Sequence, residues 1–182
     1  MVKKWQKLGS RIVYEDRWVK IRSDQMKMSR DQVQDWTVIE EGEGAAIGAL
    51  TDDNKLILIK ENRVGAGEIM WHLPAGYFDP EVESKEESAR RELREETGYE
   101  AGEIINLANL HRAPSRYTQI MSYYLARDLR LTKQSLEPDE DIEVALIDFR
   151  EVLNMIDRGE ITDVETVVVV LLIDRYVRNE NN

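Results

Sequence analysis

Residues 83–99, ESKEESARRELREETGY, decide the fold, and Leu73-Pro74-Ala75-Gly76 precede them by a short loop. Ser84 is a suitable N-cap, and Glu87 stands three positions later, as in a capping box. Gly98 is placed to end a helix with a left-handed cap. We therefore predict a helix that begins after Ser84 and ends before Gly98.

This predicted helix has little apolar surface with which to dock on a protein core. Its clearly apolar positions are Ala89 and Leu93, four residues apart on one stripe. Glu92, Glu95 and Glu96 stand at positions i, i+3 and i+4, so their carboxylates share one face within a single turn. Packing alone explains this segment poorly.

Three carboxylates on one helical face repel one another unless a cation lies among them. An all-oxygen ligand set of this kind suits Mg²⁺ or Mn²⁺. The alternative is a solvated helix with ion pairs along its surface, such as Glu87 with Arg91 and Arg91 with Glu95.

The overall composition narrows the class of protein. The chain has 182 residues, of which 42% are hydrophobic and none is cysteine. This length suggests one domain, or one domain with a small appendage. The lack of cysteine excludes disulfides, thiolate metal sites and a cysteine nucleophile. Because residues 1–16 contain no apolar signal-peptide core and the longest apolar run, residues 167–173, is far shorter than a membrane helix, we expect a cytoplasmic protein without a membrane partner.

The charge is negative and unevenly distributed. The formal net charge is -11, which disfavours nucleic acid as a partner because such binding relies on basic side chains. Residues 79–100 hold nine acidic and four basic side chains, and residues 135–145 hold five acidic and no basic ones. Ten of the eleven surplus charges thus belong to two segments, which are either two solvated surfaces or two sides of one cation site.

The N-terminal residues predict a small sheet. Apolar and polar side chains alternate in residues 11–22 and 33–39, as in half-buried antiparallel strands. A sheet of this size cannot bury both faces alone, so it needs either the main domain or a second subunit. We expect residues 1–40 to form this appendage and residues 41–182 to form the main domain.

The main domain is predicted to be α/β with a mixed sheet. Thr162 and Glu165 suggest a capping box at the start of a C-terminal helix, despite the β-branched run that follows. The other predicted elements are strands at residues 42–60 (a pair joined by a turn at 52–54), 69–73, 104–111, 119–126 and 144–149, and a helix at residues 150–158.

The acidic helix and the residues before it resemble the Nudix box, which contains a glycine, a glutamate and then R-E-U-x-E-E-x-G-U, with U apolar or aromatic. Glu83 stands at the required spacing before Arg91. One departure is a sixth residue between Gly76 and Glu83, where the pattern has five. We interpret it as an insertion in the loop over residues 77–82, which leaves the helix register unchanged. The residues that match in register are Arg91, Glu92, Leu93, Glu95, Glu96, Gly98 and Tyr99.

The resemblance implies a Nudix α/β/α sandwich with a mixed sheet, joined to the small N-terminal antiparallel β-sheet. It also implies a pyrophosphatase in which Glu92, Glu95, Glu96 and the backbone carbonyl of Ala75 bind two or three Mg²⁺ or Mn²⁺ ions. Such ions neutralise a pyrophosphate and lower the pKa of a bound water, which then attacks phosphorus. Glu96 and Arg91 are assigned to catalysis, and Arg91 is expected to orient the glutamates by pairing with one of them.

Most of the chain is similar to the ADP-ribose and nucleotide-sugar pyrophosphatases, in which an N-terminal sheet is exchanged between the subunits of a homodimer. In these enzymes two tryptophans, one from each subunit, sandwich the base. Trp18 in RWVKI and Trp36 in DWTVI are similar to them, and the alternative is that both belong to a core or a dimer interface.

A loop glutamate acts in these enzymes as a metal ligand or general base. Glu140 matches it best, with Glu137 and Glu143 as alternatives.

The same enzymes carry a Q-x-R motif and then a strand that ends in E-L-P-A-G. Here Glu61-Asn62-Arg63 keeps the arginine, which contacts phosphate in the relatives, and His72 replaces the glutamate. Gly76 is a further expected substrate contact. Arg116 is assigned to the distal phosphate or the sugar.

We therefore expect Mg²⁺-dependent hydrolysis of ADP-ribose or a nucleoside diphosphate sugar to a nucleoside monophosphate and a sugar phosphate. One alternative is the same chemistry on dinucleoside polyphosphates or capped RNA, which would call for more basic residues near the site. The other is a Nudix-like module that binds a nucleotide and regulates a partner without hydrolysis. Such modules commonly lose box glutamates, whereas this chain keeps them.

Overall fold

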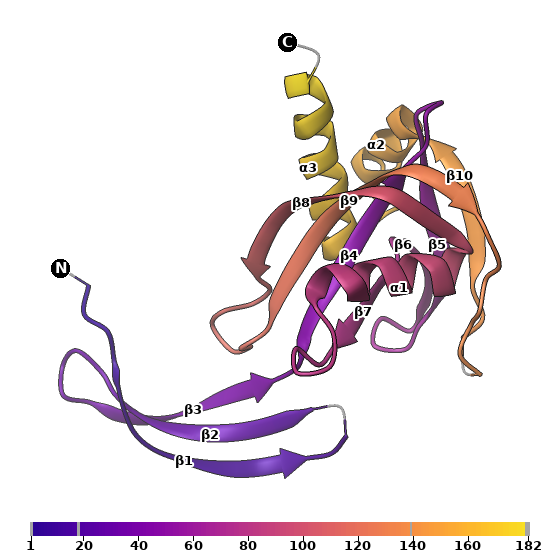
Figure 1. Ribbon diagram of the computed structural model, residues 1–182. Coiled ribbons are helices and arrows are strands. Elements are labelled where there is room, and N and C mark those ends of the chain that lie inside the picture. The colour runs from indigo at the N-terminus through magenta and orange to yellow at the C-terminus, as the bar shows by residue number, and fades with distance from the viewer. Residues whose placement is uncertain (1, 18, 139, 181–182) are drawn as a thin grey trace. The chain divides into compact units, whose positions relative to one another are not determined.

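The computed structural model describes residues 2–17, 19–138 and 140–180 (Figure 1). The chain folds into two compact units. The first comprises residues 1–42 and 110–120, and the second comprises residues 43–109 and 121–182.

The first unit contains a three-stranded antiparallel sheet in the order β1 (Gln6–Glu15), β2 (Lys20–Lys27), β3 (Val33–Glu40). The prediction of one continuous strand over residues 11–22 was wrong, because the chain reverses between β1 and β2. The Asp16 carboxylate accepts a hydrogen bond from the Val19 N–H at 2.9 Å, and the Asp16 N–H donates to the Val19 carbonyl at 3.1 Å. A short acidic side chain that bonds to the nearby backbone favours such a turn over a strand.

The second unit is built on a mixed seven-stranded sheet with the order β10-β5-β4-β9-β8, in which β6 pairs with β5 and β7 pairs with β4. The pairing of β4 with β9 is parallel, whereas β4 runs antiparallel to β5 and β7. The strands are β4 (Glu43–Leu50), β5 (Lys55–Arg63), β6 (Glu68–His72), β7 (Ala75–Phe78), β8 (Tyr99–His111), β9 (Ile120–Leu131) and β10 (Glu143–Asp148).

Helices cover both faces of this sheet (Figure 1). They are α1 (Lys85–Thr97), α2 (Phe149–Asp157) and α3 (Val164–Glu180). The central strand β4 shows the division, because Ala45 and Ile47 pack in one cluster with Leu93 of α1, whereas Ala46 packs in another with Val169 of α3. A strand buried on both faces needs a nearly continuous apolar sequence, as β4 has. The predicted α/β/α sandwich with a mixed sheet is confirmed.

The predicted C-terminal helix is also confirmed, but its predicted cap was wrong. The Thr166 N–H donates to the Asp163 carboxylate at 2.8 Å, so Asp163 performs the capping expected of Thr162 with Glu165. The helix begins at Val164, and an acceptor must lie just before the first helical residue to reach these N–H groups. Among the described helices, none is long and apolar enough to cross a membrane.

Candidate active site

The phase of α1 is fixed by its two caps, as the sequence predicts. The Ser84 hydroxyl accepts from the Glu87 N–H at 3.2 Å, and the Ser84 N–H donates to the Glu87 carboxylate at 2.8 Å. Gly98 has a φ of 74°, and its N–H donates to the Arg94 carbonyl at 2.9 Å. In this phase the buried face of α1 includes Glu92 and Glu96 beside the apolar residues.

These two buried carboxylates lie against the start of β7. The Ala75 N–H donates to the Glu96 carboxylate at 3.2 Å. A Cβ atom built on Gly76 would lie 1.9 Å from Oε1 of Glu92, so only glycine fits without displacing that carboxylate. The Ala75-Gly76 segment and the first and last glutamates of the predicted ligand set therefore meet in the structure.

Arg91 contacts three of the surrounding carboxylates. Its guanidinium lies 2.8 Å from Glu83, 2.9 Å from Glu92 and 3.2 Å from Glu95. The hydrogen bond with Glu83 is the main cause of a raised pKa for Arg91. We expected one such pair, and the structure contains three, which makes Arg91 the centre of the network.

The electrostatics of Glu92 and Glu96 show incomplete charge compensation. Burial raises the pKa of Glu92 to about 7, with Arg91 opposing the shift and Glu95 and Glu140 adding to it. Burial raises the pKa of Glu96 to about 9, with repulsion from Glu92, Glu140 and Glu61 adding to it. A cation beside these oxygens would offset the cost of ionising both groups.

The chemistry of this donor set fits a hard divalent cation. Carboxylate and backbone carbonyl oxygens are the ligands that Mg²⁺ and Mn²⁺ prefer. In residues 2–17, 19–138 and 140–180, no three Asp, Glu or His side chains lie together as a preformed metal site. Instead Arg91 lies between Glu92 and Glu95. Binding of a cation would therefore require these side chains to turn toward it.

The loop with the additional residue forms a compact turn. The Asp79 carbonyl accepts from the Val82 N–H at 2.9 Å and from the Glu83 N–H at 3.1 Å. The Asp79 side chain accepts from the Glu81 N–H at 2.9 Å. The turn is followed at once by the Ser84 cap, so the inserted loop leaves the helix register and the Glu83–Arg91 pair in place.

The second acidic segment approaches the same carboxylates through Glu140. Its side chain is half-buried and accepts from the Glu137 N–H at 2.8 Å. The charge of Glu140 contributes to the raised pKa of both Glu92 and Glu96. Glu137 is exposed, and Glu143 is the exposed first residue of β10.

Arg63, the predicted phosphate contact, is half-exposed at the end of β5 and pairs with Glu61 at 2.5 Å. Glu61 also lies 3.1 Å from Nε2 of buried His72, with the distance of an ion pair but without the directional geometry of a hydrogen bond. His72 is the chief cause of a lowered pKa for Glu61. Sequence reasoning missed this pair, because the β5–β6 pairing that joins its residues has no local signature.

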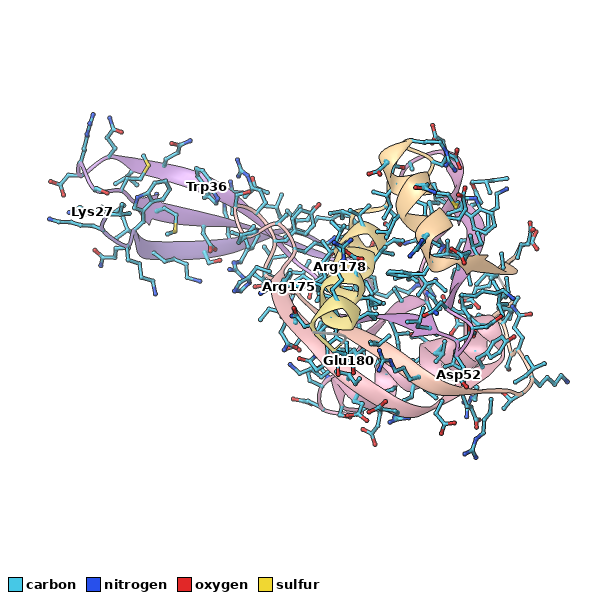
Figure 2. All side chains as sticks on the ribbon, turned by 90° about the horizontal axis from the view of Figure 1, so that it is seen from above. Lys27, Trp36, Asp52, Arg175, Arg178 and Glu180 are labelled. Carbon is cyan, nitrogen blue, oxygen red and sulfur yellow. The ribbon has the colours of Figure 1, made fainter. Side chains whose placement is uncertain are left out.

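In the first unit Trp36 lies on β3 (Figure 2) and is already in contact with other side chains. Its indole N–H donates to the Ser115 carbonyl at 2.9 Å, and the Arg116 guanidinium lies 4.3 Å from the ring centroid. Trp5, which no motif singled out, meets Trp36 edge to face at 5.5 Å. Trp18, the other tryptophan of the expected base sandwich, lies outside the described residues.

The sequence model of the NUDIX domain matches residues 42–167, well over half of the chain. The chain belongs to the NUDIX family. This finding confirms the resemblance seen in the box and the prediction of a Nudix pyrophosphatase.

Two similar proteins of this family are bacterial enzymes. The NUDIX chain is 29% identical over 131 residues to an ADP-ribose pyrophosphatase of Bacillus subtilis, covering 71% of this chain and 70% of the relative. It is 34% identical over 146 residues to a GDP-mannose pyrophosphatase of Escherichia coli K12, covering 72% and 73%. The crystal structure of an ADP compounds hydrolase has the same fold, with a TM-score of 0.89, 23% identity, and coverage of 99% of this chain and 97% of that one.

Proposed function

We propose that this NUDIX chain hydrolyses the pyrophosphate bond of ADP-ribose or a nucleoside diphosphate sugar, with Mg²⁺ or Mn²⁺, to a nucleoside monophosphate and a sugar phosphate. The observation that carries the proposal is the buried pair Glu92 and Glu96 beneath Ala75-Gly76, with pKa values raised to about 7 and about 9. The relatives named for ADP-ribose and GDP-mannose support the substrate class.

The proposed metal ligands are Glu92, Glu95, Glu96, Glu140 and the Ala75 carbonyl, for two or three ions. When bound there, the ions neutralise the pyrophosphate and make a bound water more acidic. Each remaining task belongs to residues of the chain itself.

Arg91 holds the glutamates in place through its three ion pairs. Glu140 or Glu96 accepts the proton of the attacking water, as a general base within hydrogen-bond reach must. Arg63 and the Gly76 backbone bind the phosphates, for which a guanidinium and an approachable N–H are suited. We thus assign proton transfer to the acidic segments and phosphate binding to the end of β5 and the start of β7.

The base is assigned to the two tryptophans that resemble the base sandwich of the relatives. Trp36 provides an aromatic face for the base, and stacking on such a face is worth about 1–3 kcal/mol and tolerates different bases. Trp18 is proposed as its counterpart from the sequence alone. Arg116, which covers Trp36 in the structure, would contact the distal phosphate or the sugar after leaving the indole face.

We also propose a homodimer in the cytoplasm, with residues 1–40 as the dimerising appendage of a domain over residues 41–182. Every residue of β1 is exposed within the chain, including apolar Ile12 at 58% and Tyr14 at 51%. Several apolar side chains that their own chain leaves uncovered on one strand are typical of an interface with another subunit.

The test is to incubate the protein with Mg²⁺ and, separately, ADP-ribose, GDP-mannose, UDP-glucose, diadenosine polyphosphates, capped RNA and nucleoside triphosphates, and to identify the products. We expect a nucleoside monophosphate and a sugar phosphate from at least one nucleoside diphosphate sugar or from ADP-ribose. Turnover restricted to the polyphosphates or capped RNA would contradict the proposed substrate class. No turnover at all, with measurable nucleotide binding, would indicate a regulatory module.

A further inference from the structure

Glu61, Arg63 and His72 form a polar cluster near the ends of β5 and β6, outside the box. The Glu61 carboxylate contacts the Arg63 guanidinium at 2.5 Å and Nε2 of His72 at 3.1 Å. His72 is 3% exposed, and its Nδ1 lies 3.0 Å from the Leu73 carbonyl. The imidazole is held by burial and by the contact of its Nδ1 with the Leu73 carbonyl, and Glu61 lies between this buried ring and the half-exposed Arg63 guanidinium.

The pairing of β5 with β6 places this cluster on the face of the sheet that carries α1. Ile57 of β5 packs in the same cluster as Leu93 of α1, and residues two apart on a strand share a face, so Glu61 and Arg63 continue that face beyond the apolar part of β5. His72 lies directly opposite Ile59, on the same face. Consistent with this placement, the charge of Glu61 contributes to the raised pKa of Glu96.

The side chain of Arg63 is long and 47% exposed, so without a partner it would sample many rotamers. Glu61 restricts these rotamers through its ion pair with the Arg63 guanidinium at 2.5 Å. A guanidinium that is already oriented loses less freedom when it binds a phosphate.

We propose that Glu61 is a positioning residue for Arg63: its carboxylate, anchored by His72, orients the Arg63 guanidinium for the phosphates of the substrate. This inference rests on the proposed function of the site. Glu61 itself does not touch the substrate in this scheme, so it acts on substrate binding through Arg63 alone.

A double-mutant cycle tests the inference, with Glu61→Gln, Arg63→Ala and the double variant assayed on the best nucleoside diphosphate sugar or on ADP-ribose. We expect Arg63→Ala to raise KM about ten-fold or more, as loss of a charged hydrogen bond does. Glu61→Gln should raise KM about five-fold with kcat within about two-fold of the wild type. In the double variant KM should equal that of Arg63→Ala within about two-fold, because Glu61 then has nothing to orient.

A matched control is Glu86→Gln, which removes a Glu–Arg ion pair of 3.1 Å with Arg90 on the outer surface of α1 and should leave KM unchanged. If Glu61→Gln does not fold, Glu61→Asp replaces it, since the shorter side chain keeps the charge but withdraws it from Arg63. Additive effects on KM in the cycle would overturn the inference. So would a fall in kcat at unchanged KM, which would place Glu61 among the groups that act on the metal carboxylates.

The same double-mutant cycle can be measured without turnover. For each variant the Kd of ADP-ribose is determined by calorimetry with Ca²⁺ present. Coupling of the two substitutions in Kd supports the inference even if the wild type hydrolyses nothing, a result that would contradict only the proposed function. An active wild type with additive substitutions would contradict only the inference.

Discussion

Glu96 combines burial, a backbone hydrogen bond and repulsion from neighbouring carboxylates at one position. It is 5% exposed, accepts from the Ala75 N–H and has a pKa raised to about 9. A carboxylate that is costly to ionise in the free protein becomes favourable once a cation shares its environment. The free energy of metal binding at this residue therefore includes relief of the repulsion that Glu92 and Glu140 exert.

We predict that Glu96→Gln lowers kcat by about 100-fold or more with Mg²⁺, because loss of groups beyond the ligands of a metal already costs about 10- to 100-fold. The substitution also removes the charge that attracts the cation, so the rise in Tm on adding Mg²⁺ should be smaller than in the wild type. Steady-state kinetics and thermal unfolding measure the two effects. Glu86→Gln is the control on the same helix, and full activity of Glu96→Gln would refute the metal assignment.

The stability of the metal-free protein should fall as the pH rises. The folded-state pKa values of Glu92 and Glu96, about 7 and about 9, lie above the ordinary value of 4.5. A raised pKa stabilises the folded state fully below pH 4.5, and this stabilisation is lost as the pH passes through 7 and 9. We expect Tm in EDTA to fall by several degrees between pH 5 and pH 9. Saturating Mg²⁺ or the Glu96→Gln substitution should make the fall in Tm with pH smaller. An equally steep fall in Glu96→Gln would show that other groups cause it.

At the scale of elements, the decisive contact is between β7 and α1. Hydrogen bonds of the Ser84 cap set the phase of α1. Pairing with β4 sets the register of β7, and so its position along the sheet. Glycine at position 76 lets the two elements approach until the strand touches Glu92. The spacing of the carboxylates from the backbone is thus a property of helix–strand packing, which the glycine permits.

We predict that Gly76→Ala lowers kcat by at least about ten-fold while the protein stays folded. The added Cβ would lie 1.9 Å from Oε1 of Glu92, so that carboxylate has to move away from β7. Misplacement of a catalytic group by about 1 Å can cost about 100-fold in rate. Gly65→Ala is the matched control, because nothing lies within 4 Å of its added Cβ. Circular dichroism shows whether both variants fold, and equal kcat values in the two would disprove the argument.

Local signals in the sequence predict elements whose ends are set by local bonds. The bounds of α1 follow from Ser84 and Gly98, because both caps bond within a few residues of themselves. The break between β1 and β2 was missed, since alternation of apolar residues continues through the turn that Asp16 makes. The Glu61–His72 pair depends on strand pairing, and the cap by Asp163 depends on where α3 begins. The carboxylates of the box were predictable because their helical spacing alone places them together.

At the scale of the whole molecule, the chain divides into a unit that carries the box and a unit that carries Trp36. The net charge of -11 belongs largely to the two acidic segments, both in the second unit. Metal ions bound there would neutralise much of this local charge and allow an anionic substrate to approach. The first unit contains an aromatic and cationic pair instead, with the Arg116 guanidinium over the Trp36 ring.

We predict that Ile12→Lys converts the proposed homodimer to a monomer. Ile12 is 58% exposed on β1 within one chain, and a lysine there would place a charge in an apolar interface, which costs several kcal/mol when it has no partner. Analytical ultracentrifugation should show twice the chain mass for the wild type and the chain mass for the variant. Leu131→Lys is the control, because Leu131 is 72% exposed at the end of β9 in the other unit. This substitution should leave the dimer intact.

If Trp18 of one subunit completes the base site of the other, monomeric Ile12→Lys should also show a raised KM at unchanged fold. A monomeric wild type, or a dimeric Ile12→Lys, would show that β1 is not the interface.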